Sequence, residues 1–192
     1  EFRHETIIAT LSTWLLIAGV VLVVLAPNLM RSEFKLDPPF VSKIALIATV
    51  MNLIGSLFAG FLSDRIGIIR TLLLFSLLLG GSSTLFFSTI ESGSLPIIGA
   101  TYSFAALFLG IVACVPIIII QLFPAPIRLS GMGFSYNIGN AFFAGLTTLL
   151  IPILAKHLNP MIISYYLLFL SSFGIALSLY LSKSGVIKVE TK

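Results

Sequence analysis

Six long stretches without charged residues alternate with short polar segments along the chain. The stretches cover about 6–30, 44–63, 71–90, 96–123, 129–155 and 161–182. Each is long enough to cross the hydrocarbon core of a bilayer as a helix, which takes about 20 apolar residues. None shows the alternation of apolar and polar residues, in segments of about ten, that marks a membrane β-barrel. The pattern therefore predicts an all-α membrane protein with six transmembrane helices.

The composition excludes a water-soluble globule. Hydrophobic residues make up 58% of the 192 residues and charged residues only 9%, whereas roughly a quarter of a soluble domain is charged. The net charge is +4, but the basic residues stand singly between apolar stretches instead of forming a basic stripe. We therefore expect membrane lipid, and no nucleic acid, as a partner. Cys114 is the single cysteine, which excludes a disulfide within the chain and a zinc site built from thiolates.

An even number of spans places both ends of the chain on one side of the membrane. If that side is the cytoplasm, seven basic residues lie inside and four outside, the order that the positive-inside rule favours. The inside set is Arg3, Arg65, Arg70, Arg128, Lys183, Lys188 and Lys192, and the outside set is Arg31, Lys35, Lys43 and Lys156. We therefore expect cytoplasmic termini. The chain begins without Met and its first apolar stretch has no cleavage site, so we expect a fragment or a processed piece of a longer protein.

Side-chain amides inside the spans occur only in the first, second, fourth and fifth stretches. Polar groups are costly at membrane depth, so these four helices are expected to face a wet or protein-lined space, and the third and sixth to face lipid more. The candidates for such a cavity are Asn28, Asn52, Tyr102, Gln121, Tyr136, Asn137 and Asn140. Each amide is equally suited to a hydrogen bond between helices.

Small residues and a proline predict further features of the helices. Ser56 and Gly60 in the second helix, and Gly174 and Ser178 in the sixth, lie four apart and permit close helix contact. Pro116 removes a backbone donor within the fourth stretch, which predicts a bend there.

The segment between the second and third stretches carries a recognisable motif, GFLSDRIGIIR at 60–70. It resembles the loop signature of the major facilitator superfamily, Gly-x-Leu-Ala/Ser-Asp-Arg-x-Gly followed by two basic residues. Ile68 and Ile69 replace the two basic residues here. The matching residues are Gly60, Leu62, Ser63, Asp64, Arg65 and Gly67, and Arg70 supplies one late base.

The resemblance implies that this loop is a cytoplasmic latch, which holds the outward-facing state through contacts with the opposite half of a transporter. Asp64 would lie near a helix N-terminus, where the dipole stabilises a carboxylate. Arg65 and Arg70 would pair with carboxylates or lipid phosphates. Gly67 would permit the tight turn.

A second motif lies between the fourth and fifth stretches, QLFPAPIRLSGMGFSYN at 121–137. It resembles the sequence that joins the penultimate helix pair in the metabolite:proton symporter branch of the superfamily, which contains importers of proline, betaine and organic acids. Pro124, Arg128 and Gly131 fit that pattern, whereas Gln121 replaces the usual glutamate. The order of the two motifs fits the C-terminal six of twelve helices.

The resemblance implies a specific function for residues 1–192. They would form the C-terminal half of a carrier, built as a three-plus-three inverted repeat, with the N-terminal half absent and the substrate bound between the halves. We expect proton-coupled symport of a small polar metabolite, an organic acid or zwitterionic osmolyte, in a bacterial inner membrane. No Asp, Glu or His lies inside a stretch, so the proton carrier is expected in the missing half, unless the protein is a uniporter.

The sequence also leaves other functions open. The alternatives are a drug or sugar carrier of the same superfamily, and a six-helix channel or a truncated remnant that does not transport. No Ser-His-Asp set, phosphate-binding glycine loop or metal-ligand spacing occurs in the sequence. We therefore expect no enzyme activity, no cofactor and no metal.

Overall fold

The computed structural model describes residues 2–90 and 94–185, and every element in these ranges is helical. Among the described residues, six helical segments are long and apolar enough to cross a membrane, which confirms the predicted fold. They are Arg3–Ser32, Pro38–Ile66, Ile68–Ile90, Leu95–Leu122, Ala125–His157 and Ile162–Ser184.

Two of the six spans are interrupted in their interior by turns that are not α-helical. The first comprises α1 (Arg3–Ser12), a 3-10 turn (Thr13–Leu16), α2 (Ile17–Val20), a π-helical turn (Val21–Leu25) and α3 (Ala26–Ser32). The fourth comprises α6 (Leu95–Leu107), a 3-10 turn (Phe108–Gly110) and α7 (Ile111–Leu122). The remaining spans are α4 (Pro38–Ile66), α5 (Ile68–Ile90), α8 (Arg128–His157), which follows a 3-10 turn (Ala125–Ile127), and α9 (Ile162–Ser184).

Two helix boundaries differ from the predicted ones. The second helix begins at Pro38 and not near residue 44, with Asp37 preceding it. The reason is that proline is favoured in the first turn of a helix. Backbone N–H groups in that turn have no intrahelical acceptor, so the absence of one costs no hydrogen bond. The same helix continues through the predicted loop to Ile66, so that a single residue, Gly67, separates α4 from α5.

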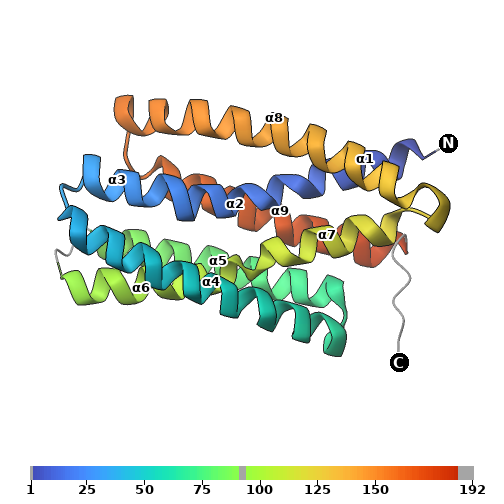
Figure 1. Cartoon of the computed structure of the whole chain (residues 1–192), viewed down its shortest axis with the longest axis horizontal. Helices are drawn as coiled ribbons and strands as arrows, with labels where there is room; N and C mark the ends of the chain where they lie inside the picture. The colour runs from blue at the N-terminus through green and yellow to red at the C-terminus, as the bar shows by residue number, and fades with distance from the viewer. Residues whose placement is uncertain (1, 91–93, 186–192) are drawn as a thin grey trace.

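The spans run along the long axis of the molecule, with α8 at one edge and α4 and α6 at the other (Figure 1). The first span and α7 lie between these edges, and α5 and α9 run behind them. The Nε2 atom of His4 lies 2.6 Å from the Tyr180 hydroxyl. This contact joins the first turn of α1 to the last turns of α9, so the described ends of the chain share one end of the bundle. Lys188 and Lys192 lie outside the described residues.

Helices α5 and α9 meet through small residues. A Cβ atom at Gly80 would collide with the Ser171 side chain, and one at Gly174 with Ser76. The Ser178 hydroxyl donates a 2.8 Å hydrogen bond to the Ile69 carbonyl. The predicted close contact at Gly174 and Ser178 is therefore confirmed.

The other predicted small-residue contact, at Ser56 and Gly60, is not made by Gly60 within the described residues. A Cβ atom at Gly60 would meet nothing within 4 Å, and the close approach of α4 occurs at Gly55 instead. There a Cβ atom would overlap the Leu107 carbonyl, and one at Gly110 would overlap the Gly55 carbonyl. The backbones of α4 and the fourth span therefore touch at the 3-10 turn. Regular α-helix is interrupted at this crossing and resumes in α7, which continues through Pro116; the bend at Pro116 stays a prediction.

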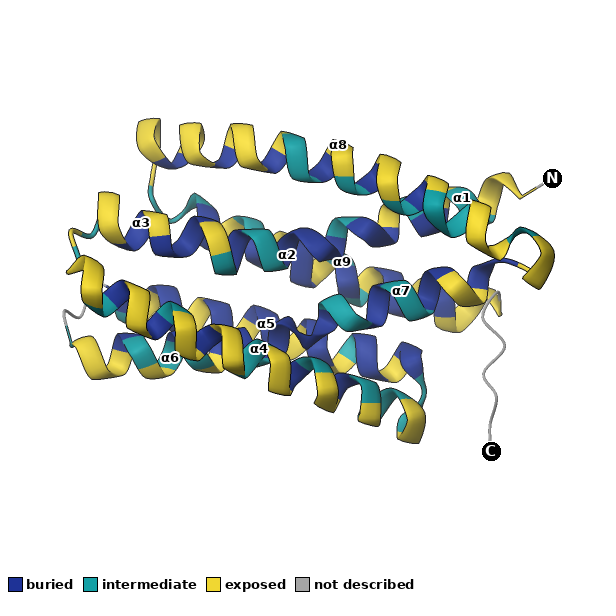
Figure 2. Ribbon diagram, viewed as in Figure 1, coloured by how far each residue is buried: buried dark blue, intermediate teal, exposed yellow. Residues whose placement is uncertain are grey.

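Exposure is concentrated on α4 and α8 (Figure 2). In the most apolar part of each helix, 22% of the residues are buried in α4 and 28% in α8, against 50% in α5 and 44% in α9. The amide-bearing helices α4 and α8 are therefore the most exposed ones in the isolated chain, and the expectation that the third and sixth helices face lipid more stays a prediction. The physical reason for this exposure is that α4 and α8 lie at the edges of the bundle, whereas α5 and α9 cover each other.

Candidate functional site

The predicted cavity residues other than Tyr102, which belongs to α6, lie on α3, α4, α7 and α8, whose ribbons lie toward the viewer in Figure 1. Six of the seven are at least partly exposed there: Asn28, Asn52, Gln121, Tyr136, Asn137 and Asn140. No hydrogen bond joins any two of these six side chains within 2–90 and 94–185. They are therefore separate polar groups on helices that contact one another in sequence, α3 with α4, α4 with α7 and α7 with α8, and not an interconnected network.

Tyr102 does not belong to this set, contrary to the prediction. Its side chain is only 1% exposed, and its ring lies 5.1 Å from that of Phe86. Its hydroxyl donates a 2.8 Å hydrogen bond to the Leu22 carbonyl in the first span. A phenol that is buried and already bonded is not available to a substrate.

Asn52 and Asn137 differ in how their amides are satisfied. The Asn137 Nδ2 atom donates a 2.7 Å hydrogen bond to the Gly133 carbonyl on its own helix. The Asn52 Oδ1 atom is buried and has no hydrogen-bond partner in the part of the chain that the structure describes. An unsatisfied acceptor is costly in an apolar surrounding. Asn52 is therefore the candidate whose amide is least satisfied by the described residues.

The first motif forms a one-residue turn. Gly67 has φ +88° and ψ 151°, a conformation that L side chains rarely adopt. Its N–H donates to the Ser63 carbonyl at 3.0 Å, and its carbonyl accepts from the Thr71 N–H at 3.1 Å. The predicted need for glycine at this turn is confirmed.

Replacement of Gly67 by alanine should destabilise the protein by about 1–3 kcal/mol, because the new side chain would be held in a strained backbone conformation. The measurement is the thermal unfolding midpoint in detergent. Gly81→Ala is the matched control, since a Cβ atom at Gly81 meets nothing within 4 Å. Equal midpoints for the two variants would contradict the assignment of strain to Gly67.

Asp64 is placed differently from the prediction. It lies in the last turns of α4 and not at the N-terminus of α5, so the nearest helix dipole disfavours its charge. It forms no ion pair with any residue in the described ranges. Arg65, expected to pair with an anion, lies with its Cζ atom 4.8 Å from the centre of the Phe61 ring. The charges of this motif therefore have no counter-charge within the described part of the chain.

The second motif builds a compact loop around Phe123, a residue that the sequence analysis did not single out. Phe123 is 2% exposed, and its carbonyl accepts a 3.2 Å hydrogen bond from Arg128 Nε. A Cβ atom at Gly131 would lie 2.7 Å from the Phe123 ring, so the glycine makes room for it. Pro124 follows Phe123, the residue that caps the end of α7. Both motifs lie at the end of the bundle where α1 begins (Figure 1).

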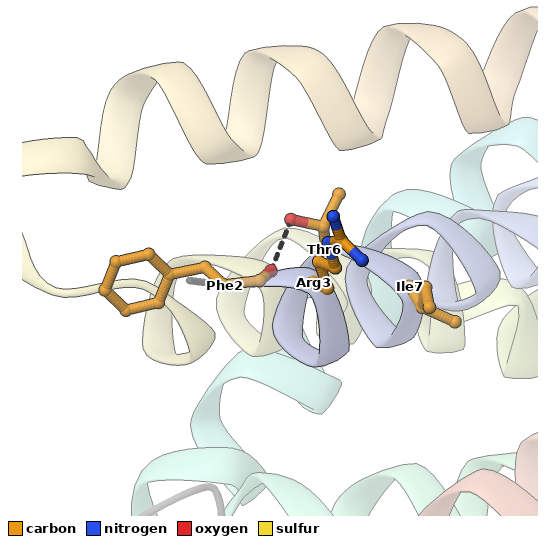
Figure 3. Close-up of a pocket in the computed structure, with 4 residues that line it drawn as sticks. All are labelled: Phe2, Arg3, Thr6 and Ile7. Atoms are coloured by element: carbon orange, nitrogen blue, oxygen red, sulfur yellow. Dashed lines mark hydrogen bonds between the residues drawn. The ribbon is translucent and has the colours of Figure 1, made fainter.

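An open depression occurs at this same end, beside the first turns of α1 (Figure 3). It is lined by Phe2, Arg3, Thr6 and Ile7, and the Thr6 hydroxyl donates to the Phe2 carbonyl at 2.7 Å. None of the predicted cavity residues lines it. Because one helix supplies its whole lining, this depression is not the predicted substrate cavity.

Sequence reasoning also missed a polar cluster that joins three helices. Trp14 Nε1 donates a 2.8 Å hydrogen bond to the Tyr166 hydroxyl, which lies 2.7 Å from Thr147 Oγ1. The Trp14 ring stacks on Phe143, with 4.6 Å between ring centres. The partners are up to 152 residues apart, so no local pattern pointed to them. The cluster fastens α8 to the first span and to α9.

Comparisons with known proteins agree with this architecture. A model of the sugar (and other) transporter family matches residues 2–182. No curated protein sequence matches the chain significantly. A solved structure of the xylose transporter XylE from E. coli, in an inward open conformation, superposes with a TM-score of 0.69 and 16% sequence identity.

The superposition covers 95% of this chain and 47% of the xylose transporter, so the chain spans about half of that protein's length. At this level of identity the likeness shows the fold, which is one half of a major facilitator transporter. The metabolite:proton symporter branch remains a prediction from the second motif. Because the family model matches nearly the whole length, the chain belongs to the sugar (and other) transporter family of the major facilitator superfamily.

Proposed function

We propose that this chain is one six-helix half of a secondary carrier, which moves a small polar metabolite across a membrane by alternating access. The first support is the pair of edge helices, whose outer sides are long, apolar and without a neighbour. On α4 the exposed side chains include Leu46, Leu53, Leu57 and Phe58, and on α8 they include Phe142, Leu146 and Leu149. A second six-helix half would cover these surfaces.

Both helices carry polar side chains that a purely lipid surrounding would not satisfy. Thr49 and Asn137 are exposed, and Asn52 and Asn140 are partly exposed. Polar groups at membrane depth usually face protein or a water-filled cavity. We therefore place the other half, and a solute pathway, against the face that carries these amides.

The unsatisfied Asn52 Oδ1 atom carries the proposal for the substrate class. The Asn52 side chain is partly exposed, and a change of its rotamer would offer this acceptor to a solute that brings hydroxyl groups, such as a sugar or polyol. A betaine brings no donor, and a deprotonated organic acid also requires a cation, although no charged residue lies within the six apolar stretches. We therefore place a neutral, hydroxyl-rich solute first and a zwitterionic osmolyte second, with an organic acid requiring its cation from the other half.

Proton coupling is proposed to depend on the other half as well. The apolar stretches of this chain contain no Asp, Glu or His, and proton symport needs a group that titrates within the pathway. We further propose that the two motifs face the cytoplasm of a bacterial inner membrane, in keeping with the distribution of basic residues.

The test is solute uptake by the complete carrier reconstituted in vesicles, with a labelled sugar, a betaine and a dicarboxylic acid, each with and without a proton gradient. Asn52→Leu should raise KM for the transported solute about two- to tenfold, the equivalent of one hydrogen bond. Thr49→Val is the matched control, since the Thr49 hydroxyl already bonds the Ala45 carbonyl at 2.9 Å. An unchanged KM in Asn52→Leu would contradict the substrate proposal.

The six-helix chain alone distinguishes a carrier half from a channel. Reconstituted by itself, residues 1–192 should give no uptake, because alternating access needs two halves that rock around a shared site. Solute flux through vesicles that contain only this chain would contradict the carrier proposal and support a six-helix channel.

A further inference from the structure

The π-helical turn of the first span leaves one backbone carbonyl without a donor from its own helix. Within this turn, the Ala26 N–H bonds the Val21 carbonyl, five residues earlier. In a regular α-helix the same N–H would serve Leu22. The next N–H along the chain is absent, because residue 27 is proline. The Leu22 carbonyl therefore has no intrahelical partner.

A side chain from another span satisfies this carbonyl. Leu22 is 0% exposed, so water is not its partner. The Tyr102 hydroxyl, from α6, donates to its carbonyl at 2.8 Å. Tyr102 is itself buried and rests against Phe86 of α5. The hydroxyl thus supplies the donor that the wider turn and the proline together remove.

We propose that Tyr102 is a positioning residue that fixes the π register of the first span, and thereby the side of the helix on which Asn28 lies. Pro27 leaves one carbonyl without a donor in either register, at Leu22 in the π turn and at Val23 in a continuous α-helix. The Tyr102 hydroxyl meets the first of these two carbonyls. It therefore stabilises the π register over the alternative.

The register decides where Asn28 points. A π turn contains one residue more than an α turn, and one residue corresponds to about 100° of rotation around a helix. Asn28 is exposed, whereas its neighbours Pro27 and Leu29 are buried. Loss of the π turn would therefore move Asn28 to a direction that a buried neighbour now occupies. A role for this rotation in substrate binding rests on the proposed function, but the register itself does not.

The test uses thiol labelling in the membrane-embedded protein. Cys114, which is buried, is replaced by alanine, and Asn28→Cys provides the reporter for a membrane-permeant maleimide. Tyr102→Phe should lower the labelling rate at position 28 severalfold. Pro27→Ala should do the same for a different reason, because it supplies the N–H that completes a continuous α-helix.

Two controls separate a change of register from general damage. Ile7→Cys, on α1 before the π turn, should be labelled at the same rate in all variants. Tyr166→Phe also removes a bonded hydroxyl, from the contacts with Trp14 and Thr147, but neither of these partners belongs to the π turn. It should leave the labelling at position 28 unchanged.

Unchanged labelling at position 28 in both Tyr102→Phe and Pro27→Ala would overturn the proposal. If Tyr102→Phe fails to accumulate in membranes, the Pro27→Ala measurement decides alone. In the complete carrier with Asn28 intact, Tyr102→Phe should also raise KM more than it lowers kcat. Altered labelling with an unchanged KM would uphold the register assignment and contradict the placement of Asn28 at the substrate.

Discussion

Replacement of Gly55 by alanine is expected to reduce the amount of folded protein sharply, and far more than the same replacement at Gly60 of the same helix. The added Cβ atom would overlap the Leu107 carbonyl oxygen and lie 2.7 Å from its carbonyl carbon. A backbone group cannot rotate away as a side chain can, so α4 must separate from the fourth span along the crossing. We expect a loss of about 3 kcal/mol or more, at the upper end of overpacking costs.

The measurement is the amount of monodisperse protein after detergent extraction, together with its thermal unfolding midpoint. Gly60→Ala is the matched control, because a Cβ atom there meets nothing within 4 Å. Its midpoint should stay level or rise, since alanine favours a helix over glycine by about 0.5–1 kcal/mol. Normal folding of Gly55→Ala would show that the close crossing of the two helices is wrong.

Replacement of Asp64 by asparagine is expected to slow uptake by the complete carrier about two- to thirtyfold at equal amounts in the membrane. Asp64 carries its charge in the last turns of α4, where the dipole disfavours it, and finds no counter-charge among the described residues. A cationic group in the other half would pair with Asp64 in only one of the two access states. Loss of the Asp64 charge would then change the ratio of the two states by a factor set by the free energy of that contact. A contact of about 0.3–2 kcal/mol corresponds to this range.

The same substitution should have the opposite sign in the isolated six-helix chain. Without the partner, removal of a charge from an unfavourable helix end leaves the stability level or raises it by about 0.3–1 kcal/mol. Asp64→Glu, which keeps the charge, serves as the control in both assays. Uptake at the normal rate by Asp64→Asn would mean that the turn is only a connector between helices.

The spans were predictable because lipid imposes a simple rule: about 20 residues without charge form a helix. Gly67 was predictable from the resemblance of its motif to the superfamily loop, in which a glycine permits a tight turn. The start of α4 was missed because Pro38 breaks a helix at most positions but favours its first turn. The position of Asp64 was missed because the helix continues through a polar segment that resembles a loop.

Contacts between distant segments were the least predictable part of the site. Gly55 and Gly60 look alike in the sequence, and only the packing of the fourth span against α4 decides which one needs to lack a side chain. Tyr102 was assigned to the cavity because a phenol within a span suggests a polar surrounding. The carbonyl that accepts its hydrogen bond is free only because a π turn forms 80 residues away. No local sequence pattern predicts that turn.

The position of Trp14 gives this protein a built-in optical reporter. It is the only tryptophan in the chain, and its indole N–H and ring face contact Tyr166 of α9 and Phe143 of α8, respectively. Indole emission responds to both hydrogen bonding and ring stacking. The intrinsic fluorescence of the unlabelled protein therefore reports whether α8 is fastened to the rest of the bundle, and it can follow movement of this helix during solute binding without any added dye.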